Sequence, residues 1–173
     1  MSRLMSKPSL AFLFVTIFLA MNLGTALAQG QSGDAPGKSK KQEKQKNKTD
    51  KAADKLAKTA KATEDQLGRD VVFCILAAHT TDVGTAQQLK DKFAALKDVP
   101  FGQFVAAVIM ADRIDKPLDE ILLKLQAGKS LGQIAQEFDV DMAELRGHFG
   151  EFRSELARSQ TTPPTRDCFK ANG

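Results

Sequence analysis

Large apolar residues are concentrated in two parts of this chain: one run near the N-terminus, at residues 10–21 and interrupted only by Thr16, and a periodic series from residue 67 onward. In the second part, large apolar side chains recur every three or four positions, as they do on one face of an α-helix. No stretch alternates apolar and polar residues in the manner of a half-buried strand. We therefore predict an all-α fold, built as a small bundle of about six helices.

Turn signals divide the periodic region into segments. Asp98-Val99-Pro100 changes the direction of the chain, and Pro163-Pro164 ends regular structure. The predicted helices cover residues 67–80, 85–97, 100–114, 117–127, 131–138 and 142–159. We accordingly place a helical domain at residues 66–159 and a C-terminal tail at residues 160–173.

The clearest local signals lie in the last third of the chain. Ser130 and Gln133 have the spacing of a capping box, which predicts a helix start at residue 131. Asp141, with Glu144 three positions later, predicts a second start at residue 142. Asp139 occupies the turn between them. We take these five residues, Ser130, Gln133, Asp139, Asp141 and Glu144, as a candidate contact corner.

The N-terminal apolar run has the three parts of a secretory signal peptide. Arg3 and Lys7 precede an apolar segment at residues 10–21, and Ala26-Leu27-Ala28 supplies the small residues of a cleavage site. We predict a signal peptide at residues 1–28, and hence an exported protein, periplasmic or secreted. An uncleaved anchor is the alternative, because about 20 residues can span a bilayer. No other segment is long and apolar enough, so we expect no membrane span after cleavage.

Residues 29–65 differ in composition from the rest of the chain. They contain ten lysines, six acidic residues and one large apolar residue, Leu56. We predict a Lys-rich tail that is disordered or marginally helical and adds nothing to the core; whether residues 48–66 form a helix stays open. The chain has a net charge of +4, but residues 66–173 carry more acids than bases. The tail is therefore either a solvated spacer or an attachment to anionic surfaces.

The mature chain contains just two cysteines, Cys74 and Cys168. In an oxidising compartment we expect them to form the one disulfide that is possible within the chain. This bond would close a loop of about 95 residues and stabilise the folded state by ~4–5 kcal/mol in the chain-entropy model. The alternative is that Cys74 acts as a small buried apolar residue within the run 71–76.

The segment Gly128-x-x-Leu131-x-x-Ile134-Ala135-x-x-Phe138-x-Val140-x-x-x-Glu144-Leu145 resembles two families. It is similar to the helix-turn-helix of bacterial regulators, which implies DNA binding, although Asp139 stands where those families usually have glycine. It also resembles the helical half of the lysin-motif domain, a β-α-α-β carbohydrate binder, which implies peptidoglycan or glycan binding. Both flanks of the segment read as helices, where a lysin motif has strands.

The pattern Gly128-x-x-x-Gly132-x-Ile134-Ala135 also resembles small exported bacterial helical proteins of uncharacterised function. That resemblance implies a helical domain outside the cytoplasm and implies no activity.

Signals for catalysis are missing from the sequence. It contains no Gly-rich phosphate loop and no nucleophile elbow, and His79 and His148 are its only histidines. We expect no enzyme activity, no catalytic residue, no cofactor and no metal ligand. We predict a non-catalytic binding or interaction module of the bacterial cell envelope, whose partner is an unknown envelope protein or glycan. The first alternative is peptidoglycan or glycan binding through the contact corner. The second is DNA binding by the helix-turn-helix, although export and the acidic net charge of the domain argue against it. The third is a hydrolase that uses a pair of carboxylates.

Overall fold

The computed structural model describes residues 36–163 and Cys168, and within these residues it contains seven helices and no strand. The helices are α1 (Pro36–Leu67), α2 (Arg69–His79), α3 (Ala86–Ala95), α4 (Phe101–Ile114), α5 (Leu118–Gln126), α6 (Leu131–Glu137) and α7 (Met142–Thr161). The all-α prediction is confirmed, and helices α2 to α7 follow the six predicted ranges closely. The predicted signal peptide, residues 29–35 and most of the C-terminal tail lie outside the described residues.

Helix α1 corrects the expectation that residues 29–65 stay out of the core. It spans Pro36–Leu67, so the helical alternative for residues 48–66 is confirmed, and the helix extends further toward the N-terminus. Ala53, Leu56 and Ala60 are buried at exposures of 5, 0 and 0%. The domain therefore begins well before residue 66. The burial of α1 could not be predicted from hydropathy, because its buried face consists mainly of alanine and threonine, which are only weakly apolar.

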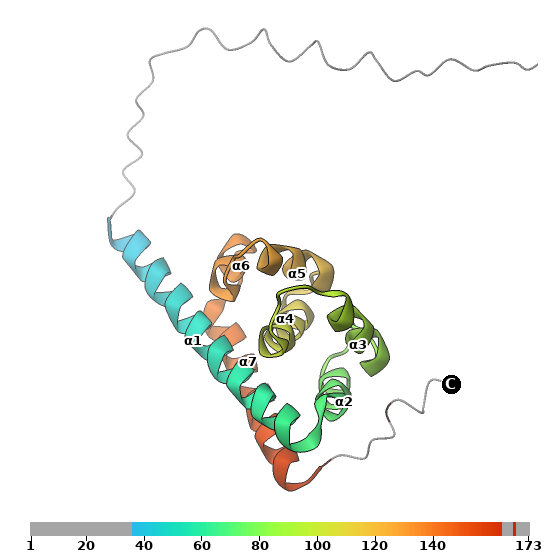
Figure 1. The fold of residues 1–173 in the computed structure, drawn as a ribbon. Coiled ribbons are helices and arrows are strands. Elements are labelled where there is room, and N and C mark those ends of the chain that lie inside the picture. The colour runs from blue at the N-terminus through green and yellow to red at the C-terminus, as the bar shows by residue number, and fades with distance from the viewer. Residues whose placement is uncertain (1–35, 164–167, 169–173) are drawn as a thin grey trace, which may run out of the picture. The chain divides into compact units, whose positions relative to one another are not determined.

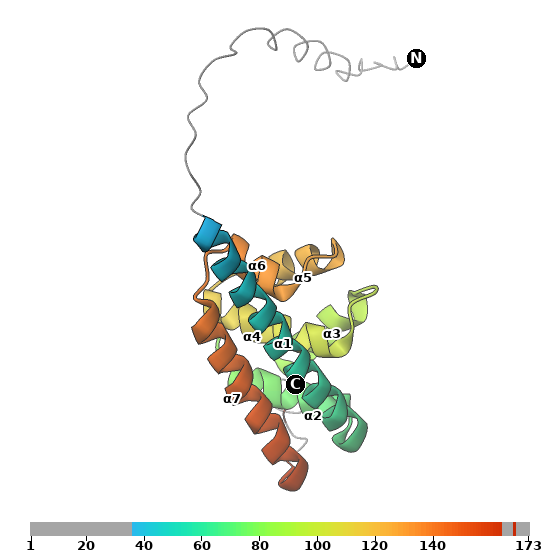
Figure 2. The same cartoon turned by 90° about the vertical axis from the view of Figure 1, so that its left-hand side faces the viewer.

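Helices α1 and α7 run parallel and side by side along one flank of the helical unit, with the other five helices on the opposite flank (Figures 1 and 2). Arg146 contacts Thr49 and Gln160 contacts Thr63, both at a separation of 97 residues. This constant offset keeps the two helices in register over about four turns. The buried residues of each helix are spaced three and four apart, as in a coiled coil: Thr49, Ala53, Leu56, Ala60 and Thr63 on α1, and Leu145, Phe149, Phe152, Leu156 and Ser159 on α7.

Small residues on α1 allow this close packing. The buried threonines would otherwise leave hydroxyl groups without partners, but each bonds to its own helix. Thr49 donates to the Gln45 carbonyl at 3.1 Å, and Thr63 donates to the Thr59 carbonyl at 2.9 Å. The polar part of the stripe is thus satisfied locally, and the methyl groups remain available for packing.

Two shorter helices meet α1 through a glycine in their first turn. At α4, Gly102 lies against Ala57; at α6, Gly132 lies against the Lys46 carbonyl and the Asp50 carboxylate. Asp50 accepts hydrogen bonds from the Gly132 N–H at 2.7 Å and from the Ser130 hydroxyl at 3.1 Å. A carboxylate of α1 therefore occupies the N-terminus of α6, where the helix dipole favours negative charge.

The centre of the core is α4, in which every residue from Phe101 to Ala111 except Gln103 is buried. Its Phe101 and Phe104 pack with Phe73 and Phe93 at ring-centroid distances between 5.2 and 6.2 Å. This cluster joins α2, α3 and α4. It belongs to the same hydrophobic core as the buried residues of α1 and α7, so one continuous core holds the unit together.

Cys74 and Cys168 form a disulfide, as predicted from their number, with a Cα–Cα distance of 5.7 Å. The bond fastens Cys168, beyond the end of α7, to α2. Within the described part of the chain, no helix combines the length and apolar character that crossing a bilayer requires.

Candidate functional site

A groove runs between α1 and α7 on the outer side of the helix pair, with a volume of about 330 Å³. Its lining residues, which we call the basic groove, are Lys48, Lys51, Ala52, Lys55, Arg146, Phe149, Gly150 and Arg153. Five of these eight are cationic and none is acidic. The groove thus concentrates positive charge in one concave place, which favours an anionic ligand.

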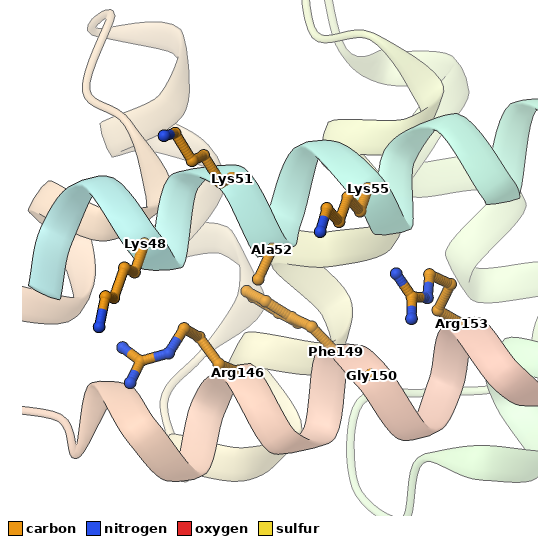
Figure 3. Close-up of a pocket in the computed structure, with 8 residues that line it drawn as sticks. All are labelled: Lys48, Lys51, Ala52, Lys55, Arg146, Phe149, Gly150 and Arg153. Carbon is orange, nitrogen blue, oxygen red and sulfur yellow. The ribbon is translucent and has the colours of Figure 1, made fainter.

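Helical spacing places these cations. Lys48 and Lys55 are seven residues apart on α1, and Arg146 and Arg153 are seven apart on α7, so each pair lies on one face, two turns apart. Because α1 and α7 run parallel in register, the two faces meet. Figure 3 shows Lys48 opposite Arg146 and Lys55 opposite Arg153, with Ala52 and Phe149 between the two pairs. Lys51 points away from α7 in this view.

None of the five groove cations has a carboxylate within ion-pairing distance among the described residues. Arg146 donates one hydrogen bond, to the Thr49 hydroxyl at 3.4 Å. Some cations outside the groove are paired, such as Lys92 with Asp119 at 2.5 Å and Lys129 with Glu137 at 2.5 Å. Unpaired cations repel one another, so gathering them in one groove costs stability that a bound anion would restore.

Gly150, one of the residues that line the groove, leaves open space where a side chain would stand. A Cβ built on Gly150 meets nothing within 4 Å, and the same is true of Gly147 one turn earlier on α7. Among the described residues, no close contact with another element requires a glycine at either position.

Three of the five residues in the predicted contact corner cap helices. Ser130 and Gln133 form the expected capping box, with Ser130 N–H donating to Gln133 Oε1 at 2.8 Å. Asp141 caps α7 as predicted and accepts from the N–H groups of Ala143 and Glu144 at 2.7 and 3.2 Å. These bonds lower the pKa of the Asp141 carboxyl, and the charge of Arg146 adds a smaller effect in the same direction.

The two remaining corner residues are placed differently. Asp139 adopts the left-handed conformation with φ of 53°, so aspartate fills the turn position where helix-turn-helix families usually have glycine. Glu144 makes no reciprocal capping bond that would complete a box; its carboxylate lies 3.6 Å from His148 Nε2.

A second hollow, of about 400 Å³, lies where this corner faces α1. It is lined by Lys41, Gln42, Gln45, Gln136, Asp139, Val140, Asp141, Met142 and Ala143. The side-chain oxygen of Gln45 is buried and has no hydrogen-bond partner in the structure. Asp139 and Asp141 therefore border this hollow, whereas Ser130 and Gln133 are engaged in capping α6.

The histidines have structural neighbours. His79 Nδ1 lies 2.6 Å from Glu155 Oε2, and its ring packs on Phe152 at a centroid distance of 4.9 Å. His148 lies between Glu144 and Glu151 on the surface of α7. The described residues contain no group of three or more His, Cys, Asp or Glu side chains arranged to hold a metal ion.

Sequence reasoning missed the basic groove. Its signal was present as Lys48, Lys51 and Lys55 at helical spacing, with Arg146 and Arg153 at the matching interval. The sequence does not indicate that α1 and α7, about a hundred residues apart, pack side by side, because local patterns carry no information on such pairing.

No family model, curated protein or solved structure matches this chain.

Proposed function

We propose that the protein is an exported, non-catalytic binding module of the bacterial cell envelope that holds an anionic partner in the basic groove. The observation that carries this proposal is the set of five groove cations without ion-pair partners in the described structure. Surface cations that serve only solubility are usually interspersed with acids, whereas a concave, single-sign site attracts and orients an anion.

The disulfide supports the exported part of the proposal. Disulfides persist in oxidising compartments and are rare in the cytosol, and the Cys74–Cys168 bond agrees with the signal peptide predicted at residues 1–28. Intact mass of the protein from the envelope fraction tests this: a chain starting at Gln29 with no free thiol is expected. A chain that keeps Met1 and two free thiols would contradict export.

Charge substitution is the appropriate test of the groove, because truncating residues 29–65 would remove α1 and uncover Phe149 and Phe152. We compare the wild type with K48Q/R146Q in co-sedimentation with an acidic envelope polymer. The control K58Q/R158Q removes the same charge from the same two helices outside the groove lining. The groove variant should bind about tenfold more weakly at low salt, and 0.5 M salt should abolish the difference by screening.

Equal loss in the groove variant and in the control would reduce the interaction to general charge attraction. Absence of binding to any acidic polymer or anionic vesicle, at low salt and with a folded protein, would overturn the proposal.

Glycan binding through the contact corner is the second candidate, and the unpartnered Gln45 oxygen favours it. A buried acceptor without a donor is costly, and a hydroxyl or amide of a sugar would satisfy it. Asp139 and Gln136 line the same hollow and supply further hydrogen-bonding groups. Pull-down on purified cell walls with Q45A and Q136A variants tests this candidate; undiminished binding would exclude the hollow.

Duplex DNA binding through α6 and α7 has weaker support. The inner face of α7 is packed against α1, and its exposed residues include Glu144 and Glu151, which repel phosphate. This alternative would gain support if the K48Q/R146Q variant bound a DNA duplex as tightly as the wild type does, in a salt-dependent manner.

A further inference from the structure

The charges of the basic groove are divided between its two ends. Lys48 and Arg146 form one pair of opposed cations, and Lys55 and Arg153 form the other (Figure 3). Seven residues separate the pairs on each helix, which corresponds to ~10.5 Å along the axes. At this distance two anionic groups of one ligand would each meet two cations.

Between the two cation pairs the floor of the groove is uncharged, since Lys51, the fifth cation of the lining, points away from α7 (Figure 3). Ala52 is half-buried, Phe149 is buried, and Gly150 offers no side chain at all. A ligand that crosses from one cation pair to the other would therefore pass over an apolar floor with room at Gly150. An uncharged linking unit suits this floor better than a continuous row of charges, because a central anion would be desolvated there without a paired cation on each side.

The positive surface continues along α1 beyond the groove. A shallow depression next to it is lined by Lys40, Lys44, Asn47, Lys48 and Lys51, with Glu43 as its one acidic residue. From Lys40 to Lys55 the track extends for ~22 Å along the helix axis. A track of this length that shares Lys48 and Lys51 with the groove favours an elongated ligand over a compact head group.

We propose that the groove binds a linear polymer whose anionic groups are separated by uncharged units, such as a polyol phosphate chain, with successive phosphates at the two cation pairs. This inference rests on the proposed function and specifies its ligand. Binding of this kind depends on the spacing of the anions in addition to their number, and this dependence separates it from general attraction to negative charge.

The test measures binding of propanediol, hexanediol and dodecanediol bisphosphates to the full exported chain by calorimetry, with hexyl monophosphate as reference. The hexanediol compound should bind most tightly, about tenfold better than the monophosphate, because it reaches both cation pairs. Affinity that is independent of linker length would overturn the two-point arrangement.

Variants at either end give a second readout. K48Q/R146Q and K55Q/R153Q should each reduce hexanediol bisphosphate to the affinity of the monophosphate and abolish the length optimum, whereas K58Q/R158Q should leave the optimum in place. K40Q/K44Q should weaken poly(ribitol phosphate) about fivefold and leave the bisphosphate unaffected. Equal effects of K40Q/K44Q on both ligands would contradict a track that extends beyond the groove.

Gly150 provides a matched pair of steric variants with Gly147. G150L fills the floor of the groove, while G147L adds the same side chain to α7 outside the groove lining, and both positions have open space. Both variants should fold, as circular dichroism will verify, and only G150L should lose binding of hexanediol bisphosphate. Equal binding by the two would show that the floor is not occupied.

The outcomes distinguish this inference from the proposed function. If polyanions bind through the groove cations but linker length has no effect on affinity, the proposed function is supported. The proposal of a polymer with spaced anionic groups is then wrong. If phosphatidylglycerol vesicles bind more tightly than poly(ribitol phosphate) through the same cations, the ligand is a lipid surface and the polymer is again wrong. If no anion binds, both proposals fail.

Discussion

Gly102, in the first turn of α4, lies directly against Ala57 of α1: a Cβ on Gly102 would come within 2.6 Å of both the Cα and the Cβ of Ala57. The backbones of the two helices therefore approach as closely as their atoms allow. Gly132 of α6 meets α1 in the same way at Lys46 and Asp50. The similar sequences Phe101-Gly102-Gln103-Phe104 and Leu131-Gly132-Gln133-Ile134 thus reflect two helix starts that dock on one long helix.

Substituting Gly102 by alanine should destabilise the protein although alanine favours helices. The added methyl group must displace backbone on α1, and we expect a loss of about 1–3 kcal/mol in the free energy of unfolding. G147A, with open space around it, should instead gain up to ~1 kcal/mol from helix propensity. Urea unfolding of both variants checks the pair; a stabilised G102A would contradict the close contact.

Leu56 tests whether α1 belongs to the domain. It is fully buried, and L56A should cost about 2–5 kcal/mol in unfolding free energy because it leaves a cavity between α1 and its neighbours. K58A, two positions away on the exposed side, should be nearly neutral. If L56A were as stable as K58A, α1 would not be part of the cooperative core.

Asp50 should matter more for stability than Asp54, although both are acidic residues of α1. D50A removes the acceptor for the Gly132 N–H and the Ser130 hydroxyl and should cost about 1–3 kcal/mol. Asp54 is exposed and makes no hydrogen bond in the described structure, so D54A serves as the control. Denaturant unfolding, together with hydrogen exchange of the α6 amides, will separate the two.

The Asp141 cap makes the start of α7 sensitive to acid. The N–H groups of Ala143 and Glu144 stabilise the ionised carboxylate and lower its pKa below the ordinary value of 3.8. A lowered folded-state pKa means that the ionised cap stabilises α7 fully above the unfolded value and loses this effect as pH falls through the folded value. The stability difference between wild type and D141A should therefore be constant above pH ~5 and shrink below 3.8. A difference that grows on acidification would contradict this assignment.

The disulfide should contribute substantially to stability because it spans 94 residues. Reduction, or the C74A/C168A double substitution, should lower the unfolding free energy by about 3–5 kcal/mol. Urea unfolding with and without reductant measures this. The double-alanine variant should be insensitive to reductant, and any residual sensitivity would point to another reducible group.

Helices α2 to α7 could be predicted because large apolar residues mark their inner faces and caps mark their ends. Ser130 with Gln133, and Asp141 at the next start, function as their sequence spacing indicates. The disulfide followed from the presence of just two cysteines in the sequence. In each case the determining information is local or a simple count.

Helix α1 and the basic groove could not be predicted in the same way. The buried face of α1 contains one large apolar residue, Leu56, and its threonines satisfy their hydroxyls within the helix. Burial here depends on the shape of the partner, since Phe149 and Phe152 of α7 supply the bulk that α1 lacks. The groove then arises from the register of the two helices, which is a tertiary property.

The constant interval of 97 residues between contacting positions of α1 and α7 also affects how the protein reaches its native state. Bundles dominated by contacts between neighbouring helices fold fast, whereas pairing of distant segments first requires the closure of a long loop. Helices α2 to α4 can assemble around their phenylalanine cluster early, but Phe149 and Phe152 stay uncovered until α1 docks. Association of α1 with α7 is therefore the expected slow step, and the period before it is when the chain is most prone to aggregate.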